Sequence, residues 1–325
     1  MQDNVAARTV LKHDFIRGFL RNSNFEIWAL PADASFRKYD RVRLEKNSFI
    51  LMDCPKEYDR LEPFIVIARF LLEHGFSAPE ILHIDYDNGF LLLEDFGDLN
   101  LGRYLLEQNE QTKTRIYQLI LDLLSKLQSI KTLNHLSHHS KELLLEELTL
   151  FTDWYVPYVK EKQWDNSQKA DFFALWGELL DSKPKIDSYI SLRDYHVENM
   201  MLLSRDGINA IGLLDFQDAV IGSPVYDVVS VLEDARFELP RDFSLKCLDY
   251  YTSQNKHLHT NEVYFDYHLL GAQRNSRILG VFARKAARDK QQNYLKYIPT
   301  ILKYLQYDLS HENLVPLRLW MQKNL

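Results

Sequence analysis

A short stretch in the second half of the chain contains the residues whose types and spacing best suit chemistry. Asp194 is followed five residues later by Asn199, and Asp215 comes after the next pair of expected strands. Carboxylate and amide oxygens, without a cluster of His or Cys, are the ligands that Mg²⁺ prefers. A carboxylate that the metal does not need can accept the proton of a hydroxyl nucleophile. The pattern therefore predicts phosphoryl transfer, with Asp194 as the base and Asn199 and Asp215 as Mg²⁺ ligands.

A non-catalytic interpretation of these residues stays open. Asp and Asn favour turns and helix caps, so Asp194 and Asn199 could simply form turns and Asp215 could cap an element. An Asp followed five residues later by an Asn also occurs often by chance. The chemical interpretation is favoured by the spacing along the sequence between this pair and Asp215-Phe216. It is also favoured by the strand-rich first part of the chain that precedes these residues.

The elements that must position these residues fall into two groups. The first group has a helix over 9–21 and a longer helix over 62–74, ended by Gly75. Its expected strands cover residues 25–30, 37–44, 49–52, 81–86 and 90–93, with a turn at 87–89. We therefore predict a five-stranded antiparallel sheet with one long helix inserted after its third strand.

After residue 98 the periodicity becomes mostly helical. Helices are expected over 101–106, 115–130, 141–159 and 168–180, and again from 226 through 319. A strand-rich island interrupts them, with strands over 189–192, 200–203 and 208–213 and a turn at 206–207. The sequence thus predicts an α+β protein whose first lobe spans residues 1–96 and whose mostly helical second lobe spans residues 97–325.

Composition excludes several classes of protein. With 325 residues, 46% hydrophobic and 26% charged, the chain is long enough for about two globular domains and is neither disordered nor fibrous. Its net charge of −7 argues against a dedicated nucleic-acid binder. Two cysteines cannot form a disulfide framework. The charged first twenty residues and the lack of a long apolar run predict a cytoplasmic protein with no membrane or nucleic-acid partner, expected to be a monomer.

Motifs spread over nearly the whole chain resemble those of one family. They cover residues 31–39, 51–55, 91–98, 193–199, 215–219, 222–227, 234–236, 273–275 and 279–282. Together they resemble the aminoglycoside-phosphotransferase superfamily of kinase-like small-molecule kinases. The run Asp33-Ala34-Ser35-Phe36-Arg37, with Gln217, is most similar to the bacterial anomeric kinases that phosphorylate N-acetylmuramate and N-acetylglucosamine in cell-wall recycling.

The resemblance implies a protein-kinase-like fold of two lobes, with ATP and Mg²⁺ as cofactors and a sugar as acceptor. The first lobe would bind the nucleotide and the second would bind the acceptor, whose anomeric hydroxyl would take the γ-phosphoryl group. Nucleotide contacts would come from a loop over the phosphates and from the hinge between the lobes, namely from Ser35, Phe36, Arg37, Glu94 and Phe96. A plain β-turn and an ordinary linker are the alternatives for these two segments.

Acceptor contacts are expected in the second half of the chain. The candidates are Arg193, Tyr195, Gln217, Asp218, Arg236 and Arg274. Residues 251–325 carry 11 basic against 5 acidic side chains, whereas residues 1–250 carry 28 against 41. This basic region would attract the lactyl carboxylate of muramate and repel a polycationic aminoglycoside. A solvated basic helical surface is the alternative explanation.

Two positions depart from the superfamily pattern. Leu192 stands where a His usually precedes the base by two residues, and Met52 stands where many kinases place a phosphate-pairing lysine. Arg37 or Lys38 could supply the missing charge. These departures motivate a rival hypothesis, a kinase-shaped binding module without turnover, although the intact set of Asp194 and its two partners argues against it. A kinase for an alcohol such as choline would need an aromatic box, which the sequence permits but does not show.

Overall fold

The computed structural model describes residues 2–31, 37–54, 61–130, 136–186 and 188–325. Contacts within the chain divide it into two compact units. The first unit comprises residues 1–107 and 198–218, and the second comprises residues 108–197 and 219–325. The lobe boundary after residue 96 stays a prediction, because these units group residues by contact and not by function. No helix in the described part of the chain is long and apolar enough to cross a membrane.

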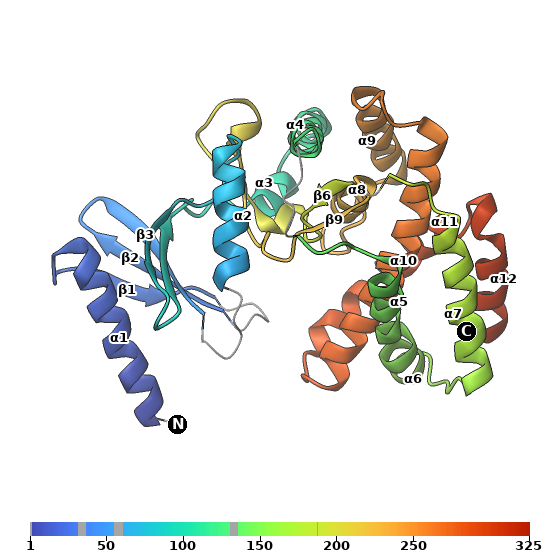
Figure 1. Cartoon of the computed structure of the whole chain (residues 1–325), viewed down its shortest axis with the longest axis horizontal. Coiled ribbons are helices and arrows are strands. Elements are labelled where there is room, and N and C mark those ends of the chain that lie inside the picture. The colour runs from blue at the N-terminus through green and yellow to red at the C-terminus, as the bar shows by residue number, and fades with distance from the viewer. Residues whose placement is uncertain (1, 32–36, 55–60, 131–135, 187) are drawn as a thin grey trace. The chain divides into compact units, whose positions relative to one another are not determined.

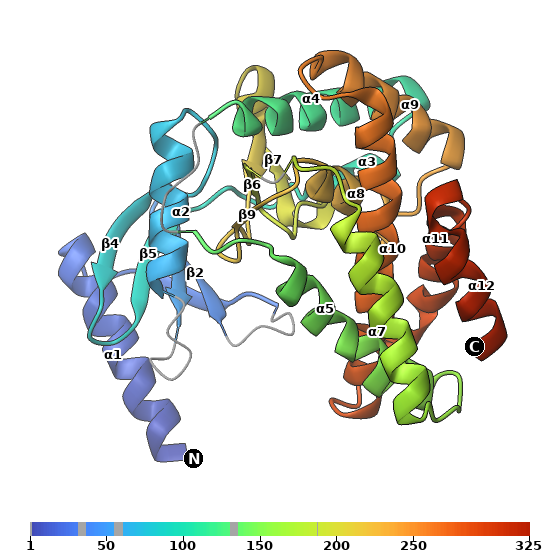
Figure 2. The same cartoon turned by 45° about the vertical axis from the view of Figure 1, so that its right-hand side comes forward.

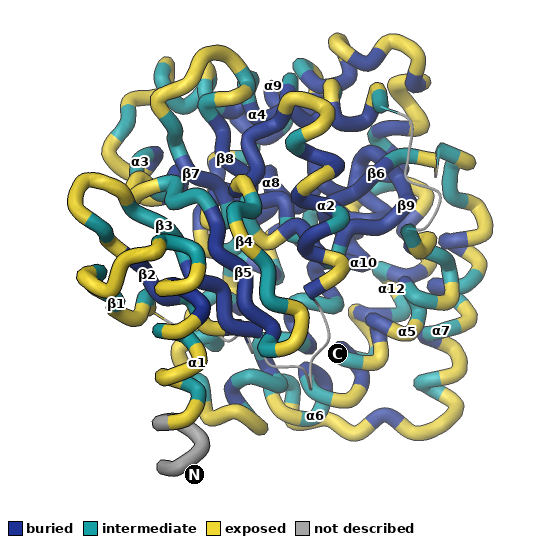
Figure 3. The backbone as a smooth tube through the Cα atoms, turned by 60° about the vertical axis from the view of Figure 1, so that its left-hand side comes forward, coloured by how far each residue is buried: buried dark blue, intermediate teal, exposed yellow. Residues whose placement is uncertain are grey.

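The first unit is built on the predicted five-stranded antiparallel sheet, shown in Figure 1. Its strands lie in the order β1-β2-β3-β5-β4. Their bounds are Glu26–Ala29 for β1, Lys38–Leu44 for β2, Asn47–Asp53 for β3, Ile81–Asp85 for β4 and Phe90–Glu94 for β5. Figure 3 shows β5 buried along most of its length, whereas β1 at the edge is largely exposed.

Figures 1 and 2 show two helices, α1 (Gln2–Leu20) and α2 (Leu61–Glu73), on opposite sides of this sheet. Phe15 and Ile16 of α1 pack against Leu51 and Leu92, which are paired across β3 and β5. Since neighbouring strand residues point to opposite faces, the equally buried Met52 and Leu91 lie on the other face. Both faces of the sheet are therefore covered. Helix α1 begins seven residues earlier than predicted.

The first unit also contains a helix and a hairpin that follow later in the chain. They are α3 (Leu101–Leu106), β7 (Met200–Leu202) and β8 (Ile211–Leu213). Asn100 caps α3 by accepting from Arg103 N at 3.1 Å, and its amide donates to Glu198 O at 2.8 Å. The ring of Phe64 on α2 stacks on Phe216 with centroids 5.0 Å apart. These contacts anchor the segment 198–218 in the first unit.

The second unit is mostly helical, as predicted, and is organised around the long helix α10 (Figure 2). Its helices are α4 (Glu110–Gln128), α5 (Lys141–Leu150), α6 (Val156–Tyr158), α7 (Asn166–Asp181), α8 (Val225–Leu232), α9 (Arg241–Gln254), α10 (Thr260–Ala287), α11 (Ile298–Asp308) and α12 (Val315–Asn324). The helix predicted over 141–159 is interrupted by a π-helical segment, Phe151–Tyr155. This segment packs against α10.

The predicted strand-rich island is in fact two separate two-stranded sheets. In the second unit, β6 (Tyr189–Ser191) pairs with β9 (Val220–Gly222), a strand that the sequence did not predict. β9 has only three residues and runs into Ser223-Pro224, so its pattern is too short to distinguish from a turn. Residues 207–210, placed partly in a strand by the prediction, form a 3₁₀ turn before β8.

Candidate active site

Asp194 lies in a tightly wound turn that follows β6 in the second unit. Asp194 N donates to Leu192 O at 2.8 Å, and His196 N donates to Asp194 O at 3.1 Å. Arg193 adopts a left-handed backbone with φ of +67°, which a non-glycine residue keeps only when its surroundings enforce it. The turn that carries the predicted base is therefore held in one conformation by other parts of the unit.

Asp227, in the first turn of α8, supplies much of that support. Its carboxylate is fully buried and accepts from Ser191 Oγ at 2.9 Å, Leu192 N at 2.6 Å and Arg193 N at 2.8 Å. Burial raises the pKa of Asp227 to about 6, although these three hydrogen bonds oppose the shift. These contacts support a role for Asp227 in bracing the loop that carries Asp194.

Arg193 and Tyr195, two predicted acceptor contacts, are engaged inside the second unit. The Arg193 guanidinium pairs with Glu147 on α5. Burial alone would raise the pKa of Glu147, but the His139 hydrogen bond and the charges of Arg277 and Arg193 lower it to about 2. The buried Tyr195 hydroxyl donates to Ile120 O at 2.7 Å. These contacts support roles in fixing the turn, and a direct contact of either side chain with an acceptor stays a prediction.

On the other side of the turn, His196 lies against Arg236. Its Nε2 is 2.7 Å from Arg236 Nη2, and Arg236 Nε donates to Asp234 Oδ1 at 3.0 Å. Burial and the charge of Arg236 lower the pKa of His196 to about 4, so the imidazole is neutral at pH 7 and its Nε2 can accept the hydrogen bond. His196 belongs to the motif at 193–199 but is not among the site residues predicted from the sequence. Its position two residues after Asp194 was the available signal.

Arg274 on α10, another predicted acceptor contact, lies behind this turn. Its side chain is buried and its Nη2 donates to Ser230 Oγ at 3.0 Å. Ser230 Oγ in turn donates to Arg193 O at 3.0 Å. Arg274 therefore supports the turn through Ser230, whereas Arg236 is the more exposed of the two arginines.

The two predicted metal ligands lie in the first unit, at one end of the β7–β8 hairpin. Met200 pairs with Leu213, and beyond the strands Leu214 N donates to Asn199 O at 2.9 Å. Asn199 and Asp215 therefore leave the hairpin at the same end. The Asp215 backbone is left-handed, with φ of +57°, and its side chain is 48% exposed. An accessible carboxylate and an amide side chain carried at the same end of one hairpin are hard-oxygen donors that fit Mg²⁺.

Arg37 and Gln217 converge on Asp215. Arg37 Nη1 donates to Gln217 Oε1 at 2.6 Å and lies 3.7 Å from Asp215 Oδ1. Gln217 Nε2 donates to Asp215 Oδ1 at 2.9 Å and to Asp218 Oδ2 at 3.2 Å. A buried arginine thus supplies positive charge next to the predicted metal ligand. Ser35 and Phe36, the other loop candidates, lie outside the described residues.

The predicted hinge contacts differ in what they can offer a nucleotide. Glu94 N donates to Glu80 O at 2.9 Å, so this amide already has a partner in the first unit. The Glu94 carboxylate pairs with Arg205. The Phe96 ring packs closely on Gly212, since a Cβ added to Gly212 would lie 2.8 Å from the ring. The Arg205 guanidinium lies 5.4 Å from the centre of the same ring. Phe96 is therefore positioned by packing against β8.

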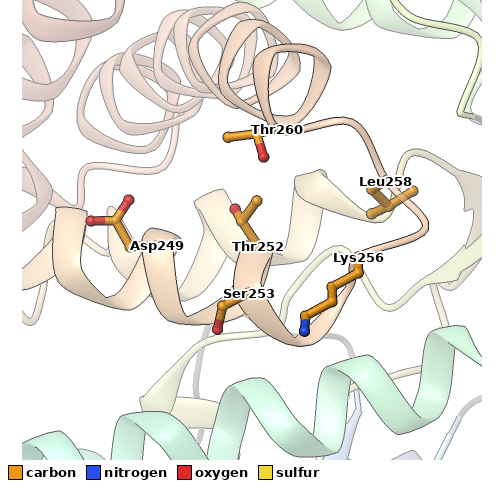
Figure 4. Close-up of a pocket in the computed structure, with 6 residues that line it drawn as sticks. All are labelled: Asp249, Thr252, Ser253, Lys256, Leu258 and Thr260. Carbon is orange, nitrogen blue, oxygen red and sulfur yellow. The ribbon is translucent and has the colours of Figure 1, made fainter.

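A surface pocket of about 360 Å³ lies elsewhere in the second unit, where α9 ends and α10 begins (Figure 4). It is lined by Asp249, Thr252, Ser253, Lys256, Leu258 and Thr260. None of these residues belongs to the predicted site. Its lining mixes one basic, one acidic and several hydroxyl side chains, which favours no particular ligand.

Comparison with known proteins decides the family. The model of the phosphotransferase enzyme family matches residues 26–262, most of the chain. The chain belongs to this family. The N-acetylmuramate/N-acetylglucosamine kinase of Caulobacter vibrioides is 30% identical over 91% of each chain. That of Pseudomonas putida is 31% identical over 85% of this chain and 81% of the relative.

Solved structures of the family's fold agree with the architecture of this phosphotransferase. A choline kinase from Streptococcus pneumoniae matches with a TM-score of 0.66 and 13% identity, over 93% of this chain and 99% of that one. An ADP-bound aminoglycoside phosphotransferase matches with a TM-score of 0.61 and 15% identity, over 90% and 97%. At these identities the matches concern the fold alone, and they confirm the predicted kinase-like fold.

Proposed function

We propose that this phosphotransferase transfers the γ-phosphoryl group of ATP to the anomeric hydroxyl of an N-acetyl amino sugar, either N-acetylmuramate or N-acetylglucosamine or both. The observation that carries the proposal is the similarity, over more than 80% of both chains, to two relatives with that named activity. ATP is a cytoplasmic metabolite, so we place the protein in the cytoplasm, where it would act as a monomer.

Asp194 is the proposed general base. The anomeric O–H gives its proton to the Asp194 carboxylate while the hydroxyl oxygen bonds to the γ-phosphorus, and the bond from that phosphorus to the oxygen of departing ADP breaks. The anomeric hydroxyl is more acidic than the other sugar hydroxyls, so one carboxylate suffices. Position matters more than basicity for such a group, and the Asp227 brace holds the turn on which Asp194 lies.

Asn199 and Asp215 are the proposed Mg²⁺ ligands. When bound, the ion would neutralise charge on the phosphate oxygens of ATP. Gln217 orients the Asp215 carboxylate by donating to its Oδ1. Arg37, 3.7 Å from the same oxygen, is proposed to supply the positive charge that the usual lysine would supply at the position of Met52.

The proposed nucleotide contacts come from the first unit. Because the Glu94 amide donates to Glu80 O, the hydrogen-bond donor to adenine is proposed to be the backbone of Phe96, with Glu94 contributing its carbonyl. Ser35 and Phe36 are proposed to cover the phosphates. Gln217 and Asp218 remain proposed acceptor contacts. The support for this proposal is that Gln217 donates hydrogen bonds to both Asp215 and Asp218.

Phosphorus NMR tests the proposal directly. The purified protein is incubated with Mg-ATP and either sugar, beside an Asp194→Asn variant whose nucleotide affinity is measured separately. A new anomeric phosphate signal, absent from a variant that still binds ATP, is the expected result. If the folded wild-type protein binds ATP but phosphorylates neither sugar, the acceptor assignment is wrong, and the rival of a binding module without turnover gains support.

A further inference from the structure

The second unit presents a positive charge beside the turn that carries Asp194. We propose that Arg236 binds the carboxylate of N-acetylmuramate and so distinguishes this sugar from N-acetylglucosamine, with His196 and Asp234 as positioning residues. The inference rests on the proposed function. The two sugars differ by one lactyl ether, which adds a carboxylate two ring carbons away from the anomeric carbon. A cation that recognises this group must therefore lie near the base but not at it.

Arg236 meets this requirement by its contacts within the second unit. Its Nη2 lies 2.7 Å from the ring of His196, and His196 N donates to Asp194 O. Only one residue therefore separates the guanidinium from the backbone of the proposed base. The proposal requires an acceptor whose anomeric hydroxyl lies at Asp194 to direct the substituent on its third ring carbon toward Arg236.

The guanidinium is fixed before any acceptor binds. Arg236 Nε donates to Asp234 Oδ1 at 3.0 Å, and Arg236 N donates to the same oxygen at 3.0 Å. His196, held neutral by burial, accepts from Nη2 on the other side. An arginine held at two of its nitrogens loses little side-chain entropy when it binds a carboxylate, which increases the affinity of that contact.

Exposure distinguishes Arg236 from the other arginines around the turn. Its side chain is 36% exposed, compared with 16% for Arg193, which pairs with Glu147. Arg274 is 4% exposed and is directed to Ser230. His196 and Asp234, which hold Arg236, are themselves buried. Arg236 is therefore the cation of this group that an acceptor can reach without a rearrangement of the core.

The test compares N-acetylmuramate with its methyl ester, which keeps the lactyl group but removes the charge. For the wild-type protein we expect kcat/KM to be about 10- to 100-fold higher for the free acid, the range for one charge-assisted hydrogen bond. Arg236→Gln should bring this ratio close to one, and Arg236→Lys should keep part of it. Arg288→Gln, an exposed arginine paired with Asp289 at the end of α10, is the matched control and should leave the ratio unchanged.

A second variant separates positioning from folding. His196→Phe keeps a ring in the core but removes the acceptor for Arg236, so the acid-to-ester ratio should fall while the protein stays folded. The inference is overturned if the wild-type protein has the same kcat/KM for the acid and for the ester. It is also overturned if Arg236→Gln lowers kcat/KM for the acid and for the ester by the same factor. If the wild-type protein phosphorylates neither sugar, the proposed function is overturned, and this inference with it. If the wild-type protein is active but Arg236→Gln has the same acid-to-ester ratio of kcat/KM as wild type, the inference alone is overturned.

Discussion

Arg37 and Gln217, 180 positions apart in the chain, are joined by a hydrogen bond of 2.6 Å between Nη1 and Oε1. Through Gln217 Nε2 the same pair reaches Asp215 Oδ1. The two motifs most similar to the sugar-kinase branch thus meet at one carboxylate. Arg37 is buried, so its charge acts on Asp215 with less screening by water than a surface arginine would have.

Loss of the Arg37 charge should therefore weaken nucleotide use. Arg37→Met keeps the length of the side chain but leaves Gln217 without its donor, and we expect kcat/KM for Mg-ATP to fall about 10- to 100-fold. The neighbouring Lys38 is exposed, so Lys38→Met is the control and should change this value by less than about 3-fold. Equal effects of the two substitutions would show that Arg37 has no special role, and a larger loss for Lys38→Met would assign the charge to the lysine.

Removal of the Asp227 carboxylate should loosen the turn around Asp194. Asp227→Ala leaves the amides of Leu192 and Arg193 buried without an acceptor, and the free energy of unfolding should fall by about 2–5 kcal/mol. At a temperature where the variant is folded, kcat should still fall by at least about 10-fold, because the proposed base is misplaced.

Urea denaturation and steady-state kinetics measure both effects of Asp227→Ala. The control is Asp242→Ala, which removes an exposed acidic residue from the first turn of α9 and should cost less than about 1 kcal/mol. If Asp227→Ala retains full stability and activity, other groups fix the turn and the brace has been assigned to the wrong residue.

A second buried acid, Glu233 at the end of α8, predicts how stability depends on pH. Burial, followed by the nearby charge of Asp308, raises the pKa of Glu233 to about 8. The groups that face it from the packed helices α9, α10 and α11 are Arg241, Tyr267, His268, Asn275 and Asp308. Because the pKa is higher in the folded than in the unfolded state, the folded protein holds a proton that the unfolded chain has released.

Stability that depends on this proton is fully present below the unfolded pKa of about 4.5 and is lost as the pH rises through about 8. The slope should approach about 1.4 kcal/mol per pH unit between these values. Glu233→Gln, which resembles the protonated acid, should reduce the slope and be more stable than wild type at pH 9. Urea denaturation across pH 5.5–9 measures this difference, and parallel curves for the two proteins would refute it.

Gly280 of α10 allows a close backbone contact with the end of α5 and the π-helical segment. A Cβ at this position would lie 2.2 Å from the carbonyl carbon of Leu150 and 2.6 Å from Phe151 N, where the π-helical segment begins. Both neighbours are backbone, so they cannot move aside cheaply. Gly280→Ala should therefore lower the free energy of unfolding by about 1–3 kcal/mol or more.

Gly177 of α7 provides the matched control for Gly280. A Cβ there meets only the end of Lys141, at 3.7 Å, so Gly177→Ala should stabilise the unit by about 0.5–1 kcal/mol through the higher helix propensity of alanine. Thermal denaturation of the two variants gives shifts of opposite sign if the contact is as close as described. Shifts of the same sign would show that α10 can move away from Leu150.

The sheet of the first unit could be predicted because its strands have local signals. The apolar run at Phe90–Leu93 follows a turn at 87–89, and the structure places β5 within one residue of that prediction. β9 had no such signal, since its three residues become a strand only by pairing with β6. Helix α1 begins at Gln2, whereas the prediction began it at residue 9. The prediction missed the first turns because they lack the apolar periodicity on which it depended.

The candidate site could be predicted only in part, for a similar reason. Asp227 lies in the motif at 222–227, next to the expected helix start at 226, and both features are visible in the sequence. The contact between His196 and Arg236 spans 40 positions, and that between Arg37 and Gln217 spans 180. Such contacts depend on how buried elements pack, which residue spacing does not encode. The roles of Asp194, Asn199 and Asp215 remain predictions that the variants above can test.

The division of the chain into units has a practical consequence for dissecting the protein. A fragment ending at Glu107 would lack the β7–β8 hairpin, and with it both proposed metal ligands. The complementary fragment would carry that hairpin without its anchors, since Leu202 N donates to Leu99 O and Asn100 binds Glu198. Cutting the gene once therefore cannot yield two autonomous halves. An isolated first unit requires residues 1–107 to be joined to 198–218 by a new linker.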